Sequence, residues 1–183
     1  YEGLGELRNG RPAWTGKIAL VEDALNEPLH WRKPALVFVN SMSDLFHPDV
    51  PDSFIDQVFA VMALCPQHQF QVLTKRPERA AEYLTAARAN PVGLEALGIT
   101  LEKHAADRAS KVGQGLMIQG DVPHLKVWPL PNVWLGTSVS DQPSADECIT
   151  ALLACLATVL FVSYEPALEL VDFTRWLKIS KPN

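Results

Sequence analysis

The chain has 183 residues, of which 48% are hydrophobic, and its formal net charge at pH 7 is -5. This length suits one domain with one sizeable core, and the acidic balance excludes a broadly basic nucleic-acid-binding surface while leaving a local basic patch open. No apolar stretch approaches the roughly 20 residues of a membrane span, no signal peptide opens the chain, and three cysteines without framework spacing indicate a reducing cytoplasm.

The chain begins at Tyr1 and stops at Asn183, directly after sequence that still reads as structured. A barrel of eight βα units usually needs about 250 residues. We therefore expect residues 1–183 to form a single α/β domain that is a fragment of a longer protein.

The first 34 residues contain several glycines and are predicted to be largely irregular. Residues 14–21 suggest a short edge strand or an extended arm, and residues 22–30 suggest a short helix. The first core strand is predicted over residues 36–40. A helix follows with apolar spacing over residues 54–63, and Asp52 or Ser53 is its predicted N-cap.

The second core strand is predicted over residues 70–73. Pro77 then begins a helix, because proline at the first helical position loses no intrahelical hydrogen bond. The pattern weakens over residues 90–131, which we interpret as an insertion with a lid or binding role. Two further core strands, over residues 133–136 and 159–163, flank a helix predicted for residues 144–157.

Short apolar strands that each lead into helix-like sequence indicate parallel βα units, so we predict an α/β fold, a partial parallel (β/α) barrel. A polar cluster follows each strand, and the carboxyl edge of a parallel sheet is where ligands bind. The sequence therefore predicts a ligand-binding mouth at that edge. Its residues are Asn40, Ser41, Ser43, Asp44, Thr74, Lys75, Arg76, Thr137, Ser138, Asp141, Ser163, Tyr164 and Glu165.

Each polar cluster also has a structural interpretation. Asp44 suits a ribose, an amine or a cation, but it equally suits capping of the next turn or a pair with Lys75. Lys75 and Arg76 stand beside a predicted helix start and suit a phosphate, a carboxylate or a nucleotide, or internal ion pairs to Asp44 or Glu165. Glu165 is a candidate general base or hydrogen-bond acceptor, or a group that orients Lys75 or Arg76.

The cysteines and histidines lack the spacing of a metal site. Cys148 and Cys155 lie about two turns apart on one predicted helix, too far for a disulfide, and Cys65 follows a different helix. The chain contains no CxxC pair and no HExxH motif. We therefore expect buried thiols and no metal within these residues.

Five segments carry a resemblance to a known family: Trp31-Arg-Lys-Pro34, Val39-Asn-Ser-Met-Ser-Asp-Leu-Phe-His47, Phe70-Gln-Val-Leu-Thr-Lys-Arg-Pro-Glu78, Leu130-Pro-Asn-Val-Trp-Leu-Gly-Thr-Ser-Val139 and Phe161-Val-Ser-Tyr-Glu-Pro166. Together they resemble an uncharacterised family of phage and prophage proteins, domain of unknown function 5131, over nearly the whole chain. Complete members look like radical S-adenosylmethionine proteins. They carry three closely spaced cysteines for a [4Fe–4S] cluster upstream of the matching part, and a glycine-glycine-glutamate-serine strand downstream.

The resemblance implies the core of a radical S-adenosylmethionine-like enzyme in a bacterial cytoplasm. Its substrate is unknown, and a distant similarity to DNA photoproduct lyases suggests nucleic acid or a nucleotide. S-adenosylmethionine and the cluster would belong to the full-length parent. We expect neither bound to residues 1–183, which would be inactive without the upstream thiolates.

The resemblance and the strand order together assign expected roles to the mouth. Cofactor contacts are expected from Asn40, Ser41, Ser43, Asp44 and Ser138; substrate contacts from Thr74, Arg76 and Tyr164; and catalytic roles from Lys75 and Glu165. Two alternatives stay open: a non-catalytic nucleotide- or anion-binding module, and a phage accessory protein that acts through residues 90–131. The sequence leaves the oligomeric state open.

Overall fold

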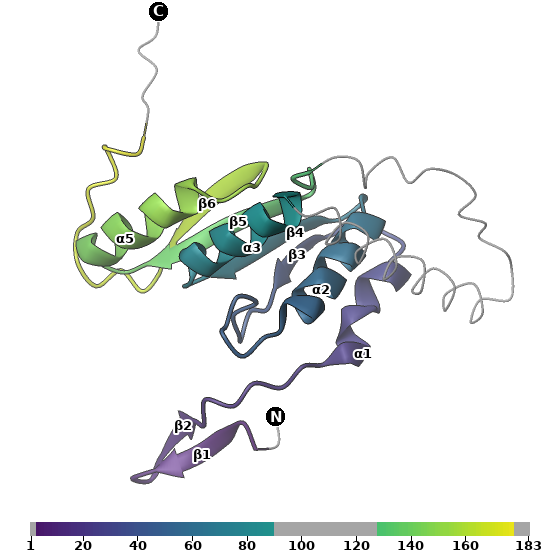
Figure 1. The fold of residues 1–183 in the computed structure, drawn as a ribbon. Coiled ribbons are helices and arrows are strands. Elements are labelled where there is room, and N and C mark those ends of the chain that lie inside the picture. Colours follow the sequence, from purple (N-terminus) through teal and green to yellow (C-terminus); the bar gives the residue numbers. More distant parts are fainter. Residues whose placement is uncertain (1–2, 90–127, 178–183) are drawn as a thin grey trace, which may run out of the picture.

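The computed structural model describes residues 3–89 and 128–177. Its centre is a four-stranded parallel sheet in the order β3-β4-β5-β6 (Figure 1). The strands alternate with helices along the chain. The elements are β3 (Leu36–Val39), α2 (Asp52–Leu64), β4 (Gln69–Thr74), α3 (Pro77–Ala89), β5 (Val133–Val139), α5 (Gln142–Leu153) and β6 (Val159–Tyr164). The predicted α/β class with parallel strands is confirmed.

The helices α2, α3 and α5 all lie on one side of this sheet (Figure 1). The strand order explains this placement. Consecutive strands are neighbours in the sheet, and crossover connections between parallel strands are right-handed in nearly all proteins, so each successive helix packs on the same face. The burial pattern agrees, because in β4 the buried residues Phe70, Val72 and Thr74 alternate with half-buried ones.

The core lies between this face of the sheet and the helices. Phe70, Val72 and Leu135 are each at most 2% exposed and belong to one apolar cluster with the buried residues of α2. Burial of each such side chain contributes about 1.5–3 kcal/mol to folding. A second small cluster around Val139 and Ile149 packs α5 onto β5.

The opposite face of the sheet is covered by no helix among the residues that the structure describes. We call it the open face. Side chains of paired residues in a parallel sheet point to the same side, so the register assigns to it Leu36, Phe38, Gln69, Gln71, Leu73, Trp134, Gly136, Ser138, Val159, Phe161 and Ser163. At its β3 edge Leu36 is 64% exposed and Phe38 is 46% exposed.

Gly136 and Phe161 are register partners at the middle of the open face. A Cβ atom added at Gly136 would lie 2.5 Å from two ring carbons of Phe161. The aromatic ring therefore lies directly against the glycine backbone, and only glycine leaves room for it at this position.

The N-terminal segment is a β-hairpin, and the prediction of irregular structure there is wrong. β1 (Gly5–Arg8) pairs antiparallel with β2 (Arg11–Trp14), and the hairpin lies apart from the parallel sheet (Figure 1). Asn9 and Gly10 form the two-residue turn with φ values of 53° and 73°. The short helix predicted next is present as α1 (Glu22–Leu25) followed by the 3-10 helix η1 (Glu27–His30).

The predicted helix ends are right only in part. Pro77 begins α3, as expected. Asp52 lies inside α2, whose N-cap is Pro51 and has no side-chain hydrogen bond. α5 begins at Gln142, because Asp141 accepts a hydrogen bond from the Ser144 N–H and the Ser144 hydroxyl completes the capping box. Most of the predicted insertion at 90–131 lies outside the described residues.

Asn132, just before β5, binds three carbonyl groups from the preceding α2–β4 connection. Its side-chain Nδ2 donates to the carbonyls of Met62 at 2.9 Å, Cys65 at 3.1 Å and His68 at 3.2 Å. One amide thus joins the end of α2, the following turn and the start of β5.

None of the helices in the described ranges is long and apolar enough to cross a membrane.

Candidate functional site

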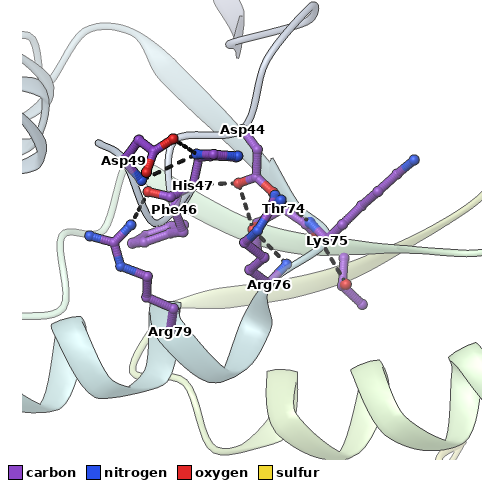
Figure 2. A network of polar contacts seen from close by, with 9 residues as sticks. Asp44, Phe46, His47, Asp49, Thr74, Lys75, Arg76 and Arg79 are labelled. Carbon is purple, nitrogen blue, oxygen red and sulfur yellow. Dashed lines mark hydrogen bonds and ion pairs between the residues drawn. The ribbon is translucent and has the colours of Figure 1, made fainter. Parts of the chain in front are cut away.

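The Asp44 carboxylate lies where the carboxyl ends of β3 and β4 meet, and it accepts hydrogen bonds from four groups (Figure 2). Its Oδ1 accepts from the Thr74 hydroxyl at 2.7 Å and from the Phe46 N–H at 3.0 Å. Its Oδ2 accepts from the Arg76 guanidinium at 2.8 Å and from the Lys75 N–H at 3.1 Å. We call Asp44, Thr74 and Arg76 the Asp44 clasp.

The Asp44 clasp holds the loop after β3 against the start of α3. The Asp44 side chain is 14% exposed, and its oxygens are occupied by donors of the chain itself. Of the two interpretations of Asp44, the geometry therefore supports the structural one. The ion pair forms with Arg76, whereas Lys75 contributes only its backbone N–H.

Thr74 extends this network to the neighbouring strand. Its hydroxyl also accepts from the Arg76 N–H at 2.9 Å, and its carbonyl accepts from the Thr137 hydroxyl at 2.9 Å. Thr74 is 1% exposed and Thr137 is 0% exposed, so both hydroxyls are removed from solvent and from any ligand at the surface. The Thr74 hydroxyl donates to the charged Asp44 carboxylate, and a hydrogen bond of this kind contributes about 1.5–3 kcal/mol to stability.

Arg79 holds the other side of the same loop, and the sequence analysis missed it. Its guanidinium donates to the His47 carbonyl, to the Val50 carbonyl at 2.8 Å and to the Asp52 carboxylate at 3.0 Å. The sequence does contain a feature that could have indicated this role, because Arg79 follows Arg76 by three residues. Arg76 directly precedes α3 and Arg79 lies in its first turn, and residues three apart at such a position are neighbours, so both arginines face the loop after β3.

Lys75 differs from its neighbours because its side chain leaves the clasp. It is exposed, and Figure 2 shows it extending away from Asp44 and Arg76, to the side of the sheet opposite the helices. Its ammonium group is therefore open to a ligand at the carboxyl edge. Thr74 pairs with Thr137, so Lys75 follows the sheet at the level of Ser138.

Ser138 of β5 and Ser163 of β6 are register partners, and both are half-buried on the open face. Tyr164, the next residue, points to the helix side, where its ring packs against Phe173 with centroids 5.6 Å apart. Its hydroxyl donates to the Glu169 carbonyl. Tyr164 therefore belongs to the second apolar cluster, and the structure separates it from the two serines.

The remaining predicted residues lie at the same edge of the sheet in different surroundings. Asn40 ends β3 with φ 58°, a left-handed conformation that asparagine tolerates, and its carbonyl accepts from the Ser43 N–H at 3.1 Å. Ser41 and Ser43 are exposed in this turn, and Glu165 is exposed after β6. Asp141 caps α5, and the Ser144 hydrogen bonds lower the pKa of its carboxyl group.

The three cysteines of this chain do not fit an iron–sulfur cluster. Cys65 follows α2 and is buried, Cys148 lies in α5 and is half-buried, and Cys155 follows α5 and is buried. Burial raises the pKa of the Cys155 thiol to about 11, which disfavours the thiolate that a metal requires. In the described ranges no three His, Cys, Asp or Glu side chains are grouped as metal ligands.

A family model described as "Protein of unknown function (DUF5131)" matches residues 3–179, nearly the whole chain. The chain belongs to the DUF5131 family. No curated protein and no solved structure matches it.

Proposed function

We propose that this chain is the core of a phage- or prophage-encoded radical S-adenosylmethionine-like enzyme that acts on a nucleotide or nucleic acid in a bacterial cytoplasm. The observation that supports this proposal is the one-sided sheet: its parallel strands are consecutive, α2, α3 and α5 lie on one face, and no helix of the described residues covers the other. In a (β/α) barrel the helices lie outside, the other sheet face lines the interior, and ligands bind at the carboxyl edge.

The proposed contacts come from residues of the carboxyl edge that lie outside the Asp44 clasp. Asn40, Ser41 and Ser43 would contact S-adenosylmethionine, and Ser138 would lie between the cofactor and the substrate. Asp44, Thr74 and Arg76 would position that edge through the Asp44 clasp. Lys75 and Glu165 are the proposed catalytic residues, since both are exposed there. Tyr164 would support β6 from the helix side.

An iron–sulfur cluster would need ligands from outside the described residues, because the three thiols present are dispersed and mostly buried. This observation also favours a second candidate function, a non-catalytic nucleotide- or anion-binding module that uses the same edge and the exposed Lys75. The third alternative, an accessory role of residues 90–131, rests on sequence that mostly lies outside the described ranges.

Anaerobic purification of the complete gene product tests the enzymatic proposal. We expect stoichiometric iron and sulfide, visible absorption from the cluster, and release of 5′-deoxyadenosine from S-adenosylmethionine after reduction. Residues 1–183 alone serve as the control and should release none. Absence of both iron and cleavage, with nucleotide binding retained, would support the binding module and contradict the enzyme.

A further inference from the structure

Phe161 and Gly136 form an aromatic patch on the open face. The Phe161 ring lies against the Gly136 backbone, since a Cβ there would come within 2.5 Å of the ring. Phe161 is half-buried, so part of it still faces outward. Trp134, two residues before Gly136, places a second half-buried aromatic side chain on the same face of β5.

Polar groups lie one step nearer the carboxyl edge. Ser138 and Ser163 each follow the patch by two residues, about 7 Å along the strand, and their register pairing places them side by side. The exposed Lys75 follows the end of the neighbouring strand β4 at the level of Ser138, and its side chain extends away from Asp44 and Arg76 (Figure 2). A path across the open face from the aromatic patch on β6 to the ammonium group after β4 therefore passes the two hydroxyl groups.

This order matches the order of chemical groups in a nucleoside monophosphate. Aromatic side chains bind bases by stacking, hydroxyl groups bind ribose, and an ammonium group binds phosphate. A nucleic-acid strand fits less well. A polyanion requires several cations along its path, whereas the chain has a net charge of -5 and Arg76 is already paired with Asp44.

We propose that the open face binds a nucleoside monophosphate, with the base on Phe161, the ribose at Ser138 and Ser163, and the phosphate at Lys75. This inference deepens the proposed function, on which it rests, by naming a free mononucleotide as the substrate class. Gly136 acts through Phe161, because a side chain there would displace the ring that receives the base.

Calorimetric titration of the chain with AMP and CMP, compared with adenosine and ribose 5-phosphate, tests the proposal. Phe161→Ala should weaken AMP binding about tenfold, which is the usual contribution of stacking one base on an aromatic ring. Phe161→Tyr keeps a ring at this position and should bind AMP as the wild type does. Lys75→Met should abolish the preference for AMP over adenosine. Phe38→Ala, an exposed aromatic at the distant β3 edge of the same face, is the matched control and should bind AMP normally.

Circular dichroism should show that every variant is folded, and Phe161→Leu replaces the alanine variant if that one unfolds. The proposal is wrong if folded wild type binds no mononucleotide at millimolar concentration, or if loss of the ring leaves AMP affinity unchanged. Tighter binding of a thymidine oligonucleotide than of TMP would contradict a mononucleotide ligand and indicate that the open face binds nucleic acid. Phe161-dependent AMP binding without S-adenosylmethionine cleavage by the complete protein would contradict only the enzymatic proposal.

Discussion

The Asp44 carboxylate and the Arg76 guanidinium meet at 2.8 Å across the carboxyl ends of β3 and β4. The two residues are 32 positions apart in the sequence. Their contact is only partly shielded, because the Arg76 side chain is 38% exposed and the Asp44 side chain is 14% exposed. Its contribution therefore lies between those of a surface pair and a buried pair.

Replacement of Asp44 by alanine should lower the free energy of unfolding by about 2–3 kcal/mol, since the Thr74 hydroxyl and the Phe46 N–H lose their acceptor together with Arg76. Urea denaturation measures this change. Asp49→Ala, at a carboxylate whose side chain is 70% exposed, is the control and should cost less than about 0.5 kcal/mol. Equal effects of the two substitutions would contradict a structural role of the clasp.

Lys75 and Arg76 are adjacent but should respond differently to alanine. Arg76→Ala removes a guanidinium from Asp44 and should cost about 1–2 kcal/mol of stability. Lys75→Ala removes an exposed side chain and should change stability by less than about 0.5 kcal/mol. Thermal unfolding of the two single variants separates these outcomes, and a comparable loss from Lys75→Ala would show that its side chain has a structural partner.

A methyl group at Gly136 should destabilise the sheet by about 1–3 kcal/mol, the usual cost of overpacking, because the Phe161 ring would have to move. Chemical denaturation of Gly136→Ala measures the loss. In the Phe161→Leu background the same substitution should cost less, and this coupling identifies the ring as the cause. Additive effects of the two substitutions would show that the ring is not the cause of the loss.

Alkaline pH should destabilise the protein through Cys155. Burial raises the pKa of its thiol from 9.0 to about 11, so the folded state keeps a proton that the unfolded chain releases. The free energy of unfolding is therefore expected to hold below about pH 9 and to fall between about pH 9 and 11. Cys155→Ala should reduce the slope measured by urea denaturation across this range. An unchanged slope would assign the effect to other groups, such as Tyr83, whose pKa is also raised by burial and by Asp56.

The four parallel strands could be predicted from the sequence because strands buried in a parallel sheet are short continuous apolar runs. The N-terminal hairpin was missed because its strands lack alternating apolar residues. Its turn nevertheless carried a signal, since Asn9-Gly10 favours the positive φ values that a two-residue hairpin requires.

The carboxyl edge was located correctly as the meeting point of the polar clusters, but the division of roles within it was not predictable. Whether Lys75 or Arg76 pairs with Asp44 depends on the direction of the chain after β4 ends. The opposite orientations of Ser163 and Tyr164 were within reach of sequence reasoning, because successive residues of a strand face opposite sides of the sheet.

The three hydrogen bonds of Asn132 have a consequence for local opening of the fold. The end of α2, the turn at Cys65 and the strand entry at His68 all depend on one amide group. Movement of the Asn132 side chain would release all three carbonyl groups at once. Their backbone amides should therefore exchange with deuterium together, as one cooperative unit that joins the α2–β4 connection to the entry of β5.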